Sequence, residues 1–235
     1  MVSANDPFNI KGMTYLIKVL ACVALLGTMS AVAAASKQDS HSNVDDHLIP
    51  IEGWLDPEYK GLLTRKLFLT PANYARIVEF PPLPSLGEIS VAIYSKANDL
   101  DRAFITRTKG ERNLWSAEFG SDPSFPRGVK VVRADARFPK STAVTLQRAL
   151  KRMIDQSHPL ENPNNSIVLD AKVVEFSIED LQAGRVGAFL SPYAVGKTGA
   201  ALRRITRLLV NYCDSDPGKR AAVAARIEAE AERLR

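Results

Sequence analysis

The stretch EISVAIYS, residues 88–95, gives the clearest indication of the fold in this 235-residue chain. The large apolar residues Ile89, Val91 and Ile93 occupy every second position of it. A period of two is typical of a strand that buries one face and exposes the other. The stretch therefore predicts a half-buried β-strand.

Four further runs with strand character lie close to this stretch. They are residues 75–80, 103–108, 113–119 and 129–134. The pieces that connect them, such as KANDLD and TKGER, are rich in turn residues and too short to contain a helix. Strands with such short connections pair antiparallel. We therefore predict successive antiparallel strands between residues 66 and 134.

Two later segments add strands to this sheet. Residues 166–178, SIVLDAKVVEFSI, predict a strand pair with a tight turn at Asp170 and Ala171. Residues 185–190, RVGAFL, predict one more strand. Both segments are short and contain β-branched and aromatic residues, which favour strands.

Helical spacing appears in three other places. Residues 141–156 carry one apolar face and end before His158 and Pro159. Residues 198–213 carry the strongest pattern, with apolar residues at helical intervals along one stripe. This stripe is Ala201, Leu202, Ile205, Leu208, Leu209 and Tyr212. The tail from Lys219 predicts a last helix.

A short helix is also expected at Asp56 and Pro57, where Asp caps the first turn and Gly61 keeps the helix short. No internal repeat is visible. The pattern predicts an α+β fold, a mainly antiparallel sheet packed against two or three helices in a single domain.

The first 35 residues have the layout of a secretory signal peptide. Lys11 and Lys18 precede an uncharged run of apolar and small residues at 19–35. If Met13 is the true start, residues 1–12 are an upstream extension. Residues 36–47 are polar and predict a flexible tether, and the domain is expected at 48–235, ending in two helices. We expect no membrane span after cleavage.

Composition narrows the class of protein. Cleavage would remove Cys22 and leave Cys213 as the single cysteine, so no internal disulfide is expected. The formal charge is +5, and the signal segment carries a net +1 of it. The basic residues are spread along the chain, so we expect no nucleic-acid partner. These features favour a periplasmic or secreted protein of the bacterial envelope.

The turn SPYAVGKTG, residues 191–199, ends like a phosphate-binding loop. Gly196, Lys197 and Thr198 match the end of that motif, but Ser191 stands at its first glycine and Pro192 removes a backbone donor. We therefore expect no nucleotide cofactor and interpret the turn as a cap, made by Thr198, for the helix that follows.

Other catalytic patterns are weak. Cys213 lies at the end of a helix beside two aspartates, which disfavours a thiolate. The metal-ligand types at 41–47 lie in the expected tether, without a rigid frame. His158 precedes a proline, and no serine-hydrolase motif occurs. We expect no catalytic, cofactor-binding or metal-ligating residues. Of the two alternatives, a protein that is not an enzyme is favoured over an enzyme.

Two basic helix faces remain as candidates for partner binding. One is formed by Arg203, Arg204 and Arg207, the other by Arg148, Lys151 and Arg152. Charged faces of this kind usually contact water, but they would suit an acidic protein or an anionic polymer. The expected function is non-catalytic binding in the envelope. The alternative is an envelope hydrolase whose active site is assembled from loops, and nucleotide binding ranks third.

Overall fold

The computed structural model describes residues 46–51, 55–83, 85–120, 128–159, 172–180, 182–192, 194 and 196–234. The expected signal peptide, most of the expected tether and the expected turn at Asp170 and Ala171 lie outside these residues.

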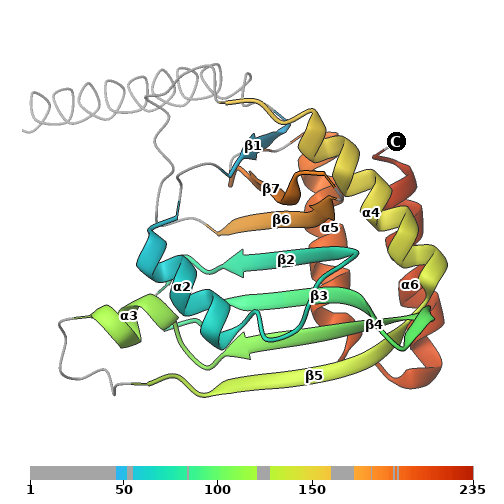
Figure 1. Cartoon of the computed structure of the whole chain (residues 1–235). Helices are drawn as coiled ribbons and strands as arrows, with labels where there is room; N and C mark the ends of the chain where they lie inside the picture. Colours follow the sequence, from blue (N-terminus) through green and yellow to red (C-terminus); the bar gives the residue numbers. More distant parts are fainter. Residues whose placement is uncertain are drawn as a thin grey trace, which may run out of the picture. The chain divides into compact units, whose positions relative to one another are not determined.

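The described part of the chain contains one antiparallel sheet of seven strands (Figure 1). Its spatial order is β1-β7-β6-β2-β3-β4-β5. The strands are β1 (Leu48–Pro50), β2 (Ala75–Phe80), β3 (Ile89–Lys96), β4 (Asp99–Gly110), β5 (Val131–Phe138), β6 (Val173–Asp180) and β7 (Gly184–Leu190). Residues 89–95 of the quoted stretch lie in β3, which confirms the predicted strand. Its predicted half-burial is wrong, because Ser90 and Ala92 are also buried, with 1% and 2% of their surface exposed, between the cores on the two faces of the sheet.

Five α-helices accompany the sheet in the described residues. They are α2 (Pro57–Lys66), α3 (Leu114–Phe119), α4 (Lys140–Asp155), α5 (Lys197–Tyr212) and α6 (Arg220–Glu232), and a short 3-10 turn at Pro217–Lys219 precedes α6. The predicted α+β class with a mainly antiparallel sheet is confirmed. None of the helices in the described ranges has both the length and the apolar character needed to cross a membrane.

The larger core lies between the sheet and α4 and α5. Leu146 and Leu150 of α4 and Leu202 and Ile205 of α5 are fully buried against strand residues such as Ile77. Helix α6 packs on both α4 and α5 (Figure 1). The two apolar stripes seen in the sequence therefore face this core.

A smaller core lies on the other face of the sheet. Leu62 and Leu63 of α2 and Leu114 of α3 pack there with Val78 and Phe189. These two helices are short, and the loop that follows α2 lies beside β2. This arrangement leaves a recess next to β2, β6 and β7.

Residues 113–119 form the helix α3, so the strand predicted there is wrong. The side chain of Asn113 caps this helix by accepting a hydrogen bond from Ser116 N at 2.8 Å. Leu114 N donates to both carboxylate oxygens of the buried Glu88 at 3.1 and 2.9 Å. A carboxylate that lies far away in the sequence therefore fixes the first turn.

Helix α2 has 10 residues and continues through Gly61 to Lys66, so this glycine does not end it. A glycine inside a helix costs about 1 kcal/mol relative to alanine. Leu62 and Leu63 follow it directly and are 1% and 0% exposed. Their burial outweighs that cost, since burying one leucine contributes about 1.5–3 kcal/mol.

The cap of α5 differs from the prediction as well. The Thr198 side chain makes no capping hydrogen bond. Instead, the Asp46 carboxylate accepts hydrogen bonds from Thr198 N at 2.8 Å and Gly199 N at 2.7 Å. The helix is therefore capped by a residue from the start of the described chain.

Candidate functional site

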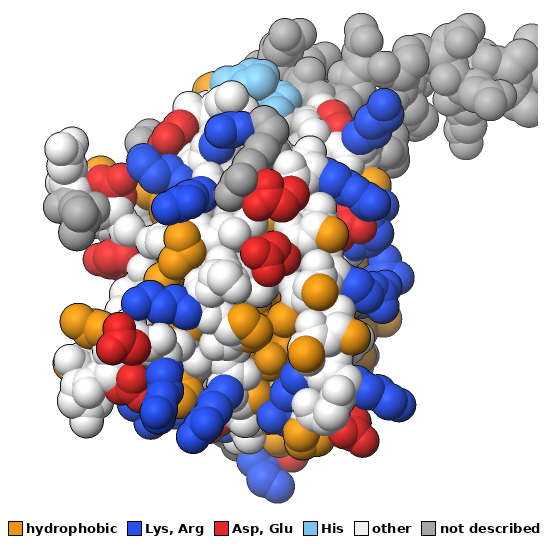
Figure 2. Space-filling model, turned by 90° about the vertical axis from the view of Figure 1, so that its right-hand side faces the viewer, with side chains coloured by type: hydrophobic (Ala, Val, Ile, Leu, Met, Phe, Trp, Pro, Cys, Tyr) orange, Lys and Arg blue, Asp and Glu red, His pale blue; other side chains and the backbone are white. Residues whose placement is uncertain are grey.

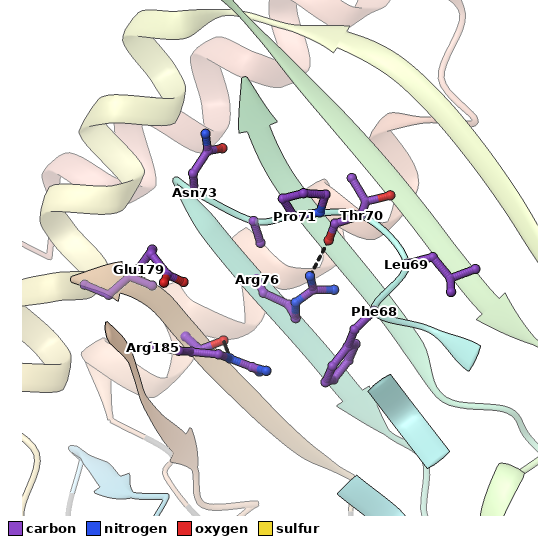
Figure 3. A pocket seen from close by; sticks show the side chains of 11 residues that line it. Phe68, Leu69, Thr70, Pro71, Asn73, Arg76, Glu179 and Arg185 are labelled. Atoms are coloured by element: carbon purple, nitrogen blue, oxygen red, sulfur yellow. Dashed lines mark hydrogen bonds between the residues drawn. The ribbon is translucent and has the colours of Figure 1, made fainter. Parts of the chain in front are cut away.

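A pocket of about 430 Å³ opens between the loop after α2 and strands β2, β6 and β7 (Figure 3). Its walls are residues 68–73 of the loop, Arg76 of β2, residues 177–179 of β6 and Arg185 of β7. We call it the arginine pocket. The sheet supplies one wall, so the two arginines are held by strand pairing.

Arg76 is the most deeply buried charge in this pocket, with 6% of its surface exposed. It lies on β2 in register with Ser177 of β6. Its guanidinium donates to Ser90 Oγ at 3.2 Å and to the carbonyl of Thr70 (Figure 3). Burial, and then the positive charge of Arg185, lower the pKa of Arg76 from its ordinary value to about 10. Arg76 therefore stays cationic at neutral pH, in a place that is costly for a charge.

Arg185 comes from β7 and is only partly buried. Its register partner on β6 is Glu179, yet its guanidinium reaches toward Glu175, which accepts a hydrogen bond from Nη2 at 2.8 Å. Its Nε also donates to Ser177 Oγ at 3.1 Å. The side chain therefore runs along the sheet toward Arg76 instead of pairing across to Glu179.

Both guanidinium groups lie over the ring of Phe68. The Cζ atom of Arg76 is 4.4 Å from the ring centroid, and that of Arg185 is 5.0 Å away. An aromatic ring attracts a cation that lies over its face. Phe68 thereby holds two like charges close together on one wall of the pocket (Figure 3).

The charged groups around the arginine pocket are two arginines, of which Arg76 is buried and Arg185 is partly exposed, and the two carboxylates Glu175 and Glu179. Glu175 is the buried carboxylate beside the arginines, with 3% of its surface exposed. Burial raises the pKa of Glu175, while the charges of Arg185 and Arg76 act in the opposite direction. Glu175 pairs with Arg185, and its charge also acts on Arg76. An additional anion in the pocket would be attracted by both guanidiniums.

The mouth of the pocket combines apolar and acidic groups. Leu69, which is 61% exposed, and Pro71 line it together with Glu179. The described residues give Glu179 no ion-pair partner. The pocket can therefore hold a negative group at the arginines and an uncharged or positive part of the same ligand near its mouth.

The two basic helix faces from the sequence analysis do not form one patch. On α5, Arg203 turns back to donate to the carbonyls of Ser191, Pro192 and Ala194 at 2.9–3.0 Å. Arg204 pairs with Glu230 of α6 at 3.0 Å, whereas Arg207 is exposed. Arg203 is thus a structural residue of the loop before α5.

On α4, Lys151 forms ion pairs with Asp155 at 3.2 Å and with Asp180 at 3.0 Å, and Arg148 and Arg152 are exposed. Helix α6 packs against both α4 and α5. The side of the molecule that carries α4 and α6 shows acidic side chains among the basic ones (Figure 2).

The remaining residues considered for catalysis or metal binding make structural contacts. Cys213 is buried and donates weakly to the carbonyl of Ile105 at 3.8 Å, and burial raises the pKa of its thiol. His158 stacks on His47 with ring centroids 3.5 Å apart. In the part of the chain that the structure describes, no group of three or more acidic, histidine or cysteine side chains is arranged to bind a metal.

Sequence reasoning did not identify the arginine pocket. A signal was present, because Arg76 lies inside the strand ARIVEF, where Glu79 is the only other charge, and Arg185 begins the apolar run RVGAFL. A charge inside a buried strand is uncommon unless it has a partner or a ligand. The sequence could not show that these two charges meet over Phe68.

Comparisons with models of known families, with curated proteins and with solved structures gave no significant match.

Proposed function

We propose that this protein is a non-catalytic binding protein that holds an anionic group of its ligand in the arginine pocket. The observation that carries the proposal is the pair of guanidiniums over Phe68, which line a cavity of about 430 Å³ and of which only that of Arg185 is paired with the buried Glu175 in the described residues. Arginine binds carboxylate and phosphate in the same planar, two-point geometry.

The size of the cavity favours an organic anion over a simple ion. Ligand pockets typically have volumes of about 300–1,000 Å³, and a bare phosphate would fill a small part of such a space. The apolar side chains at the mouth suit the carbon skeleton of a larger ligand. Together with the expected export signal, this favours an acidic substituent of an anionic envelope polymer, in the periplasm or outside the cell.

The chemistry of the pocket supports binding without catalysis. Its one serine, Ser177, has its hydroxyl oxygen engaged by Arg185 Nε. No imidazole or thiol is among the side chains that line the pocket. A serine or cysteine hydrolase needs a base beside its nucleophile, whereas two cations in a pocket need no such pair to bind an anion.

Isothermal titration calorimetry on the full chain tests the proposal with three probes: D-glucuronate, glycerol phosphate and a short glutamate peptide. They represent a carboxylate sugar, a phosphate polymer and an acidic protein. We expect saturable binding of at least one of the first two. Arg185→Gln should weaken it at least about tenfold, which corresponds to one lost charged hydrogen-bond pair.

Arg207→Gln is the matched control, because it also removes one positive charge but lies on the exposed face of α5. It should leave the affinity within about twofold, as expected for a distant exposed charge. Circular dichroism must show that both variants stay folded. No binding of any probe, binding of the glutamate peptide alone, or equal losses in the two variants would refute the proposal.

A further inference from the structure

The strand β5 forms an open border of the sheet. Within the described residues it pairs on one side only, with β4, and it ends the strand order (Figure 1). The opposite border strand, β1, is three residues long and contains Pro50, which limits pairing with another strand. β5 has eight residues and no proline. Its outer backbone donors and acceptors can therefore accept a further strand.

The sequence of β5 is complementary to itself when two copies run antiparallel. Side chains alternate along a strand, so Arg133 and Asp135 share one face, and Val132, Ala134 and Ala136 share the other. If Ala134 lies opposite its own counterpart, Arg133 of each copy lies opposite Asp135 of the other. Val132 then lies opposite Ala136, so both faces are matched.

Neighbouring registers are less favourable. Centring the pair on Asp135 would place this carboxylate opposite itself and Arg133 opposite Arg137, and like charges directly opposite each other destabilise a sheet. Centring it on Ala136 restores opposite charges but limits the overlap to residues 134–138 of the strand. The register centred on Ala134 overlaps residues 131–137.

The side chains that this pairing needs are accessible. Arg133 and Asp135 are 43% and 53% exposed, and Val132 is 45% exposed. Within one copy, Arg133 already donates to Asp135 from Nε and Nη2 at 2.9–3.2 Å. Both charges therefore lie on the same face of β5. A second copy that runs antiparallel carries them on the same face in the reverse order.

We infer that the protein forms a symmetric dimer through β5, with Ala134 on the two-fold axis and Arg133 paired with Asp135 of the second copy. The two seven-stranded sheets then continue into one. This inference is independent of the arginine pocket, which lies on the far side of β2.

Charge reversal tests the dimer by sedimentation of the full chain over a range of concentrations. Arg133→Asp or Asp135→Arg alone should weaken the dimer at least about tenfold, because two opposite-charge pairs become two like-charge pairs. The double variant restores both pairs and should recover most of the affinity. Arg148→Asp on α4 is the control for charge and should change nothing.

A cysteine cross-link tests the register in a Cys22→Ser background. Residues opposite each other in an antiparallel pair have Cα atoms about 4.5–5.5 Å apart, within disulfide range. Ala134→Cys should therefore form an intermolecular disulfide on mild oxidation, whereas Ala136→Cys should not. A chain that stays monomeric throughout, a dimer unaffected by charge reversal, or cross-linking of Ala136→Cys alone would overturn the inference.

Discussion

The carboxylate of Asp46 binds the backbone N–H of Thr198 at 2.8 Å across a sequence separation of 152 residues. It also accepts a hydrogen bond from Gly199 N at 2.7 Å. The N-terminus of a helix attracts anions, because free N–H groups and the helix dipole point toward them. In this protein, the position that a nucleotide phosphate would need beside Lys197 is occupied by the chain's own carboxylate.

We therefore expect no saturable binding of ATP or GTP with magnesium to the full chain. The physical reason is that a phosphate would have to displace Asp46 from α5, in a turn where Pro192 has no N–H to offer. Calorimetry checks this. Micromolar affinity that disappears in Lys197→Ala would show that the turn is a phosphate loop after all.

Asp46→Ala should lower the free energy of unfolding by about 0.5–2 kcal/mol, the usual cost of losing an N-cap side chain. Thr198→Ala is the matched control and should cost less, since the Thr198 hydroxyl makes no capping hydrogen bond. Urea unfolding followed by circular dichroism measures both. A larger loss of stability in Thr198→Ala would show that Thr198 caps α5, as the sequence predicted.

Gly196→Ala should displace the same carboxylate. A Cβ atom at Gly196 would lie 2.2 Å from Asp46 Oδ2, which is far inside contact distance. The loss of stability should therefore overlap with that of Asp46→Ala, and the double variant should lose less than the sum of the two. Additive losses in this double-mutant cycle would mean that Gly196 matters for another reason.

Arg203→Ala should destabilise the protein by about 1–3 kcal/mol, because a charged donor is removed from buried carbonyls. This differs from what a solvated basic face would predict, and it follows from the three hydrogen bonds that Arg203 donates before α5. Arg207→Ala is the exposed control and should have almost no effect. Ile205→Ala, in the core below, should cost about 2–5 kcal/mol. Thermal unfolding measures the loss of stability in each of the three variants and ranks them by it.

Glu88 should make stability depend on pH. Burial raises the pKa of Glu88 above its ordinary 4.5, although hydrogen bonds from Tyr59 and Leu114 act in the opposite direction. The folded protein therefore binds this proton more tightly than the unfolded chain. The associated stability is complete below pH 4.5 and is lost as the pH rises through the raised value.

Glu88→Gln removes this titration, so its stability relative to the unmodified protein should increase as the pH rises from acidic to neutral. Unfolding by urea at several pH values measures the difference. Glu118→Gln on the exposed side of α3 is the control and should run parallel to the unmodified protein. A Glu88→Gln curve that also runs parallel would show that Glu88 titrates normally in the folded state.

The main secondary structure of the core could be predicted because its signals are local. The alternation at 88–95 predicts a strand, and the stripes on 141–156 and 198–213 predict which side of each helix is buried, because such periodicity is a property of neighbouring residues. The α+β class followed from these elements and their short connections. The sequence also argued against a reactive thiolate at Cys213, since its neighbours alone disfavour one.

The tertiary structure decided what distant residues do to one another. Leu114–Phe119 form a helix because Glu88, directly before β3, accepts a hydrogen bond from its first N–H, and α5 is capped by Asp46 in place of Thr198. Arg203 stabilises a loop because that loop folds back over it.

The arginine pocket depends on the same long-range information. Phe68, Arg76 and Arg185 meet only once β2, β6 and β7 lie side by side in one register. Periodicity predicts which face of a strand is buried, because that depends on residues a few positions apart. The partner of a buried charge depends on strand order and register, which the free energy of the whole fold determines.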